Sequence, residues 1–222
     1  VGGEQVEHPV DGVDEAGRGP ILGPMAIAVV GVTVEQAATL TAAGVQDSKA
    51  YGSGARASKR RAELAATIMS TVRSRWSVHM VDPAEIDARV ALKELNKLEQ
   101  ERAASLLETT ARGEFSPDDL IVCDGHNLFR PLAEQFAQRC RFEAVDKGES
   151  HHVAVAAASL LAKVARDAAW EAIAAKYASE FGPIGGGGYL NAPVRRFLSA
   201  YKAKHGSLPP EARRSWKVSK GL

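Results

Sequence analysis

Two adjacent acids, Asp14 and Glu15, are separated by a single alanine from the segment Gly17-Arg18-Gly19. Neighbouring carboxylates can hold a divalent cation, and an arginine between glycines can offer a guanidinium and backbone amides to a phosphate. Apolar residues on both sides predict two strands joined by a tight connection, where binding groups often collect. The same residues are also typical of an ordinary polar turn, so further acids have to decide between the two interpretations.

Two more acids occupy positions where a metal ligand could stand. Asp124 ends the apolar run 120–123, which fits either a carboxylate at a sheet edge or a simple turn. In a helix with about 100° per residue, Asp167 falls about 20° from Leu160 and so shares a face with apolar residues. A carboxylate on such a face needs a partner. That partner is either Lys163, one helical turn earlier, or a cation shared with the other acids.

Convergence of the four carboxylates of Asp14, Glu15, Asp124 and Asp167 would make a site with oxygen ligands only, which favours Mg²⁺ or Mn²⁺ over zinc. Acids packed together repel one another unless cations neutralise them. Two metal ions about 3.5 to 4 Å apart would do so, and could stabilise the attacking and leaving oxygens in phosphodiester cleavage. The pattern therefore predicts metal-assisted phosphoryl hydrolysis.

The elements that must position these acids alternate along the chain. Two strands come early and later strands are separated by helices, which predicts an α/β fold with a mixed sheet flanked by helices. We expect strands at residues 10–14, 25–34, 76–81, 120–124 and 141–145, and helices at 58–75, 83–110 with a break, 128–139, 151–177 and 192–205.

Composition and charge limit the class of protein. The chain has 222 residues and 45% hydrophobic content, enough for one domain with a sizeable core. Two cysteines without framework spacing predict free thiols in a reducing compartment, and no signal peptide or membrane helix is apparent, so we expect a cytoplasmic protein. Residues 191–222 carry eight basic residues against one acid, which leaves −6 for the rest. An acidic body with a basic end suits an enzyme that acts on a polyanion, although a solvated basic face would look the same.

Several motifs together closely resemble ribonuclease HII, the type 2 ribonuclease H family, in its archaeal-type members. The resemblance runs in order over nearly the whole chain. It rests on Asp14 to Pro20, Gly44 to Lys49, Leu95 to Glu99, Ala156 to Asp167, Gly188-Tyr189, and Pro209 to Lys217.

The resemblance implies a ribonuclease H-like fold with a helical C-terminal extension, and hence a catalytic domain at 1–180 and a basic substrate-binding extension at 181–222. It implies an endoribonuclease that uses two metal ions to cut the RNA strand of RNA/DNA hybrids and to cut at ribonucleotides embedded in duplex DNA, leaving 5′-phosphate and 3′-hydroxyl ends. Its expected metal ligands and catalytic residues are Asp14, Glu15, Asp124 and Asp167. Its expected substrate-binding residues are Gly17, Arg18, Gly19, Lys49 and Tyr189.

Other classes share some of these features. Another nuclease or a recombinase of the same fold would share the acids but not the Gly-Arg-Gly and Gly-Tyr pair. A non-catalytic nucleic-acid-binding protein would need only the basic end. We further expect a monomer without membrane partners, and a flexible loop at the four glycines 185–188 that delivers Tyr189 to the substrate.

Overall fold

The computed structural model describes residues 8–46 and 48–216, and the chain divides into two compact units. The first unit holds the chain up to residue 15 together with 27–79 and 99–164. The second unit holds 16–26, 80–98 and 165 onwards. A division into a catalytic domain at 1–180 and an extension at 181–222 stays a prediction. A substrate-binding role for residues 181–222 stays a prediction.

Within the described residues, five strands form one mixed sheet in the order β3-β2-β1-β4-β5. Their bounds are β1 (Val10–Ala16), β2 (Met25–Val32), β3 (Trp76–Val81), β4 (Leu120–Asp124) and β5 (Arg141–Val145). Strand β1 pairs in parallel with β4, and β4 pairs in parallel with β5. Every residue of β2 is buried, which explains its nearly unbroken apolar sequence. The bounds of β3, β4 and β5 agree with the sequence-based expectation.

The helices are α1 (Val34–Ala42), α2 (Ala55–Val72), α3 (Pro83–Ala91), α4 (Leu95–Thr110), α5 (His126–Phe129), α6 (Ala133–Phe136), α7 (Val153–Phe181) and α8 (Ala192–His205), with short 3₁₀ turns η1 (Ser48–Tyr51), η2 (Arg130–Leu132) and η3 (Gly148–Ser150). Helix α1 was not expected. The side chains of Thr33 and Gln36 each accept a hydrogen bond from the other's amide and so cap its first turn. The helix expected at 128–139 is instead α5, η2 and α6, because Pro131 lacks the amide hydrogen that a continuous helix needs.

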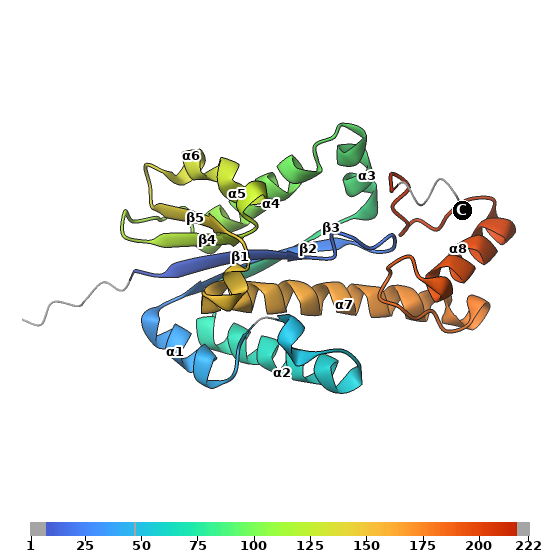
Figure 1. Ribbon diagram of the computed structural model, residues 1–222, viewed down its shortest axis with the longest axis horizontal. Helices are drawn as coiled ribbons and strands as arrows, with labels where there is room; N and C mark the ends of the chain where they lie inside the picture. Colours follow the sequence, from blue (N-terminus) through green and yellow to red (C-terminus); the bar gives the residue numbers. More distant parts are fainter. Residues whose placement is uncertain (1–7, 47, 217–222) are drawn as a thin grey trace, which may run out of the picture. The chain divides into compact units, whose positions relative to one another are not determined.

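In the first unit, helices pack on both sides of the sheet. Figure 1 shows α1 and α2 on one side and α5 and α6 on the other. The beginning of α7 packs directly against β1 at Gly12. A Cβ atom at Gly12 would lie 2.2 Å from the carbonyl carbon of Ala154 and 2.3 Å from the amide nitrogen of Val155. Only glycine allows this approach, and it holds α7 beside the strand that carries Asp14.

The second unit has a core of its own. Buried residues of α7 and α8 pack with residues of the connection between β1 and β2, and the cluster comprises Ile21, Leu22, Trp170, Ile173, Tyr177, Ile184, Val194, Phe197, Leu198 and Ala212. The aromatic rings contact one another, with 5.1 Å between the ring centres of Tyr177 and Phe197. Residues near the C-terminus are therefore part of a core rather than a loosely attached tail.

Both cysteines, Cys123 and Cys140, are free and buried, as expected. In the part of the chain that the structure describes, no helix is long and apolar enough to cross a membrane.

Candidate active site

Asp14 and Glu15 lie near the end of β1, and Asp14 is buried, with only 6% of its surface exposed. The Asp14 carboxylate accepts a hydrogen bond from the Glu15 amide at 2.7 Å and one from the Ser159 hydroxyl in α7. Burial raises the pKa of Asp14 well above its usual value, and the nearby carboxylates of Glu15 and Asp124 raise it further. The protein by itself therefore stabilises the negative charge of Asp14 poorly.

Asp124 ends β4, the strand next to β1. Cys123 stands in register with Val13, so Asp14 and Asp124 follow at the same edge of the parallel pair. The Asp124 carboxylate accepts a hydrogen bond from the Gly148 amide at 2.8 Å. Directly after it, Gly125 adopts φ 103°, a conformation that favours glycine, and turns the chain away from the sheet. The sheet thus brings three of the expected acids together.

Asp167 belongs to the second unit and lies in α7, two turns after Ser159 in the same helix. Its side chain is 21% exposed and lies 3.3 Å from the Arg166 guanidinium, measured between Nη1 and Oδ1. The structure therefore gives Asp167 a cationic neighbour, Arg166, that was not expected from the sequence.

The donor chemistry of the first unit fits a hard divalent cation. Asp14, Glu15 and Asp124 offer carboxylate oxygens only, which suits Mg²⁺ or Mn²⁺. A cation beside Asp14 would offset both the burial and the repulsion that raise its pKa. Across residues 8–46 and 48–216, no group of three or more histidine, cysteine or acidic side chains already stands in metal-binding geometry. The fit therefore rests on the type of ligand and on the electrostatics at Asp14.

The segment Gly17-Arg18-Gly19 continues directly from these acids into the second unit. Gly17 adopts φ 86°, and a Cβ atom there would lie 2.8 Å from Cγ of Arg166, so the position requires glycine. The Arg18 guanidinium donates a hydrogen bond to Oδ1 of Asn96, in α4, at 2.5 Å. Gly19 is exposed, and a Cβ atom there would lie 3.3 Å from the ring of Tyr189. The structure therefore brings Tyr189 next to the triplet.

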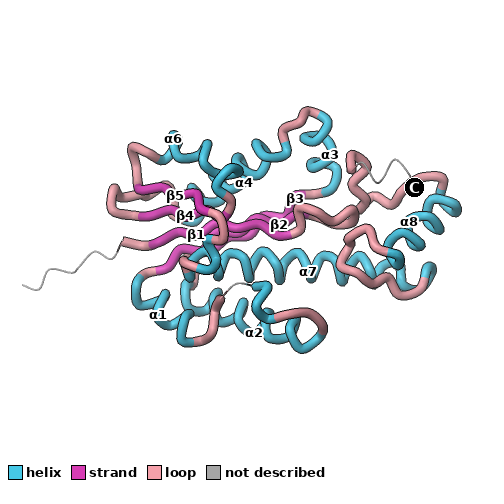
Figure 2. The backbone as a smooth tube through the Cα atoms, viewed as in Figure 1, coloured by secondary structure: helices cyan, strands magenta, loops and turns pink. Residues whose placement is uncertain are grey.

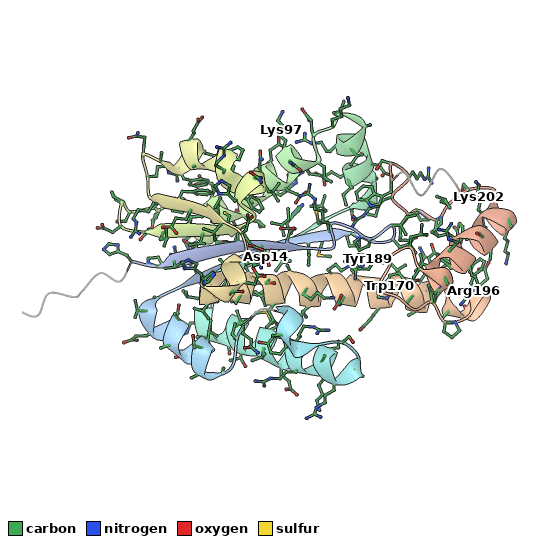
Figure 3. All side chains as sticks on the ribbon, in the orientation of Figure 1. Asp14, Lys97, Trp170, Tyr189, Arg196 and Lys202 are labelled. Atoms are coloured by element: carbon green, nitrogen blue, oxygen red, sulfur yellow. The ribbon has the colours of Figure 1, made fainter. Side chains whose placement is uncertain are left out.

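The loop that carries Tyr189, residues 186–190, is held by defined contacts and differs in this from the flexible loop expected from four glycines. The Gly188 carbonyl accepts hydrogen bonds from the amides of Ile21 and Leu22 at 2.9 and 3.1 Å. The buried Arg166 donates to the Gly187 carbonyl, and its guanidinium lies 5.7 Å from the centre of the Tyr189 ring. Tyr189 itself is 54% exposed, so its ring remains accessible on a fixed loop (Figure 3).

Lys49 lies in η1, but its side chain is outside the part of the chain that the structure describes, as is Asp47. Ser159, Arg166 and Asn96 were not identified as site residues from the sequence. A serine, an arginine and an asparagine in helices give no signal of their own, because only the fold shows what they contact.

Solved structures share the fold of this chain. The structure superimposes on a crystal structure of ribonuclease H2 from Pyrococcus horikoshii with a TM-score of 0.78 and 28% sequence identity, covering 96% of both chains. A ribonuclease HIII described as Bst-RNase HIII in complex with Mn²⁺ shares the fold, with a TM-score of 0.71, 24% identity and coverage of 96% of this chain and 68% of that one. The fold is therefore that of nucleases of the ribonuclease H type.

The sequence comparisons identify one family within this class of nucleases. A family model described as Ribonuclease HII matches residues 11–219. Ribonuclease HII of Thermococcus sibiricus is 36% identical over 217 residues, which cover 95% of this chain and 89% of that protein. The chain therefore belongs to the ribonuclease HII family and is an endoribonuclease of the ribonuclease H type.

Proposed function

We propose that this enzyme cuts the RNA strand of RNA/DNA hybrids and cuts at ribonucleotides embedded in duplex DNA, leaving 5′-phosphate and 3′-hydroxyl ends. The observation that carries the proposal is the closeness in sequence of the acids and the recognition triplet. Asp14 and Glu15 lie near the end of β1, and the Gly17-Arg18-Gly19 turn beside Tyr189 begins directly after that strand ends. The acids proposed for cleavage and the triplet proposed to bind the sugar and phosphate thus lie in one short segment of the chain.

We further propose that Asp14, Glu15 and Asp124, together with Asp167 of α7, hold two divalent metal ions, Mg²⁺ or Mn²⁺. When bound, such ions activate the attacking water and stabilise the charge that develops on the phosphate oxygens. The carboxylates of the chain bind and orient the ions, and Ser159 fixes Asp14 in place by its hydrogen bond. The donor chemistry and the raised pKa of Asp14 support this assignment.

Most of the proposed substrate-binding residues belong to the second unit. Arg18 carries a guanidinium that Asn96 orients, and the triplet amides suit the phosphate and 2′-hydroxyl around the cut. Tyr189 offers an exposed ring to a base or sugar at the junction of RNA and DNA. Lys49 is proposed to contact the substrate backbone, and Arg195 and Arg196, both exposed on α8, to contact more distant phosphates.

Family membership favours this function over the two alternatives drawn from the sequence. A recombinase of related fold would not need the triplet and Tyr189 together. A non-catalytic binding protein would not need two further acids beside a buried Asp14. We also propose that the enzyme acts as a monomer in the cytoplasm, and analytical ultracentrifugation at several concentrations tests the first of these points.

The function is tested with four labelled substrates: an RNA/DNA hybrid, a DNA duplex with one ribonucleotide, single-stranded RNA and an all-DNA duplex. Each is incubated with Mg²⁺, Mn²⁺ or a chelator, and the cut position and end groups are mapped. We expect cleavage of the first two substrates, only with metal. Cleavage of the all-DNA duplex, or of none of the four, would contradict the proposal.

A further inference from the structure

The C-terminal strap, residues 211–216, runs beside the recognition loop, residues 17–23, within the second unit. Figure 2 shows both as loops. The two segments pair like short antiparallel strands, with a bridge between Leu22 and Ala212. The Gly23 amide donates to the Glu211 carbonyl at 2.9 Å, and the Arg213 amide donates to the Ile21 carbonyl at 2.8 Å. This pairing fixes which strap side chains face the triplet.

Arg213 faces the triplet and is fully buried. Its guanidinium donates to three carbonyl oxygens: Gly23 at 3.0 Å, Arg18 at 2.8 Å and Gly17 at 2.6 Å. The indole of Trp216 donates to the remaining triplet carbonyl, that of Gly19, at 3.2 Å. Its ring also lies 5.0 Å from the Arg213 guanidinium. Each carbonyl of the triplet therefore accepts a hydrogen bond from a side chain of the strap.

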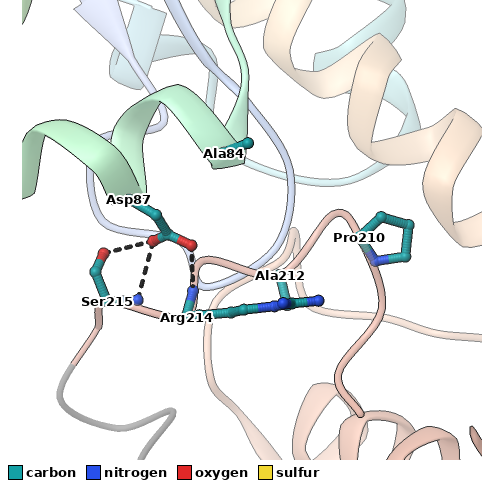
Figure 4. A pocket seen from close by; sticks show the side chains of 6 residues that line it. All are labelled: Ala84, Asp87, Pro210, Ala212, Arg214 and Ser215. Carbon is teal, nitrogen blue, oxygen red and sulfur yellow. Dashed lines mark hydrogen bonds between the residues drawn. The ribbon is translucent and has the colours of Figure 1, made fainter.

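The end of the strap is anchored separately. Asp87, in α3, accepts hydrogen bonds from the amides of Arg214 and Ser215 at 2.8 and 2.9 Å and from the Ser215 hydroxyl (Figure 4). These bonds lie at the edge of a pocket of about 600 Å³. Asp87 thus holds the two residues that lie between Arg213 and Trp216 in the chain.

The carbonyl contacts determine where the triplet amides point. In a planar trans peptide, the carbonyl oxygen and the amide hydrogen point in opposite directions. The carbonyls of Gly17 and Arg18 share their peptide planes with the amides of Arg18 and Gly19. Because Arg213 binds both carbonyls, it directs both amides away from the strap.

We propose that Arg213 and Trp216 are positioning residues for substrate recognition, which hold the triplet so that its amides and the Arg18 side chain face the substrate. The inference rests on the proposed function of the triplet. It assigns Arg213 a role that its charge alone did not suggest, because the residue is buried and contacts no solvent. The strap acts on recognition through Gly17, Arg18 and Gly19 and touches neither substrate nor metal.

The test compares Trp216→Phe and Arg213→Lys with wild type on a DNA duplex containing one ribonucleotide. Trp216→Phe keeps an aromatic ring but loses the bond to Gly19, so kcat/KM should fall by about three- to tenfold, the size expected for one hydrogen bond. Arg213→Lys loses most of the guanidinium contacts and should lose about ten- to a hundredfold. Thermal unfolding and circular dichroism are measured on each variant, and Trp76→Phe and Arg139→Lys in the first unit are matched controls with unchanged activity.

Double variants with Arg18→Ala separate recognition from general stability. If the strap acts through the triplet, Trp216→Phe should cost less activity in the Arg18→Ala background than in wild type, because the Arg18 side chain, one of the groups that the strap positions, is already absent. Losses that multiply in the double variant would overturn the inference, as would wild-type activity in folded Trp216→Phe and Arg213→Lys. Wild-type activity in Arg18→Ala alone would instead contradict the proposed function of the triplet.

Discussion

At the scale of single residues, the carboxylate of Asp14 lies in an environment that disfavours its negative charge. Its carboxylate is buried beside two other acids, and hydrogen bonds from Ser159 and the Glu15 amide compensate this only in part. Such an arrangement stabilises the protein less than a neutral group would. A divalent cation bound beside Asp14 would remove this cost, because it would neutralise the negative charge of the carboxylates.

The first prediction concerns Asp14→Asn in the absence of metal. Since the folded-state pKa of Asp14 is raised, the folded protein holds that proton more tightly than the unfolded chain. The stability that this provides is present at low pH and is lost as the pH rises through the folded-state pKa. Asparagine does not titrate, so the variant should unfold at a higher temperature than wild type, with a difference that grows as the pH is raised from about 4 toward and through the folded-state pKa of Asp14.

The measurement is thermal unfolding with a chelator across this pH range, repeated with added Mg²⁺. Mg²⁺ should raise the midpoint of wild type more than that of the variant. A difference that shrinks with rising pH would show that Asp14 is not the strained group.

The second prediction concerns Tyr189→Ala. If the exposed ring reads the junction of RNA and DNA, the variant should lose more activity on a single embedded ribonucleotide than on a long hybrid, because a hybrid offers the acids many alternative positions. An aromatic contact of this kind contributes about 1 to 3 kcal/mol. The measurement is the initial cleavage rate of wild type and Tyr189→Ala on both substrates. Equal losses with an intact fold would make Tyr189 a general binding or structural residue.

At the scale of elements, the Tyr189 loop is positioned by backbone contacts rather than delivered by flexibility. Gly188 adopts φ 77°, and a Cβ atom there would lie 2.6 Å from the Leu22 carbonyl oxygen and 3.1 Å from Arg166. Gly185, only three residues earlier, has no neighbour within 4 Å of such an atom. The structure therefore requires glycine at position 188 but has room for a side chain at position 185, although both belong to the same run of glycines.

The third prediction follows from this contrast. Gly188→Ala forces a close contact and a strained backbone, so it should displace Tyr189 and lower cleavage at an embedded ribonucleotide to about the level of Tyr189→Ala. Gly185→Ala is the matched control and should retain wild-type activity. Similar losses in the two glycine variants would mean that the whole run must be flexible, contrary to the observed contacts.

At the scale of the whole molecule, the basic residues near the C-terminus have separate roles. Arg195, Arg196, Lys202, Lys204 and Arg214 are exposed, Arg213 is buried, and Lys217 and Lys220 lie outside the described residues. Deleting residues 191–222 would remove Phe197, Leu198 and Ala212 from the core, so truncation cannot isolate the effect of charge. Substitution of exposed side chains is the cleaner test.

The fourth prediction is that Arg195→Gln combined with Arg196→Gln weakens binding to a hybrid without changing the fold. Each lost phosphate contact should lower the slope of log affinity against log salt by about one unit, so the double variant should lose about two. Binding is measured over a range of salt concentrations. The same two substitutions at Arg112 and Arg141, which are exposed in the first unit, are the control. An unchanged slope would make the face of α8 a merely solvated surface.

The sequence predicted much of this architecture because apolar strands and helix faces leave a periodic signal. Strands β3, β4 and β5 and helix α8 have the expected bounds. Helix α1 was not predicted because it begins almost directly after the apolar residues of β2. The pair Thr33 and Gln36, which forms a capping box, is the sequence signal that marks its beginning. The burial of Arg213 could not be predicted, since an arginine in a basic segment looks like any other until the fold supplies its acceptors.

We expect the carboxylates near the ends of β1 and β4 to hold the divalent metal ions on which phosphodiester cleavage would depend. The most direct measurement is the single-turnover cleavage rate of a duplex with one ribonucleotide by Asp124→Asn, beside the equilibrium binding of that duplex. Asp118→Asn, the same change at an exposed acid, is the control. We predict a rate at least about a thousandfold below wild type, with binding within about threefold, because the metal ions act mainly on the transition state. A folded Asp124→Asn enzyme that cleaves at nearly the wild-type rate would contradict the account.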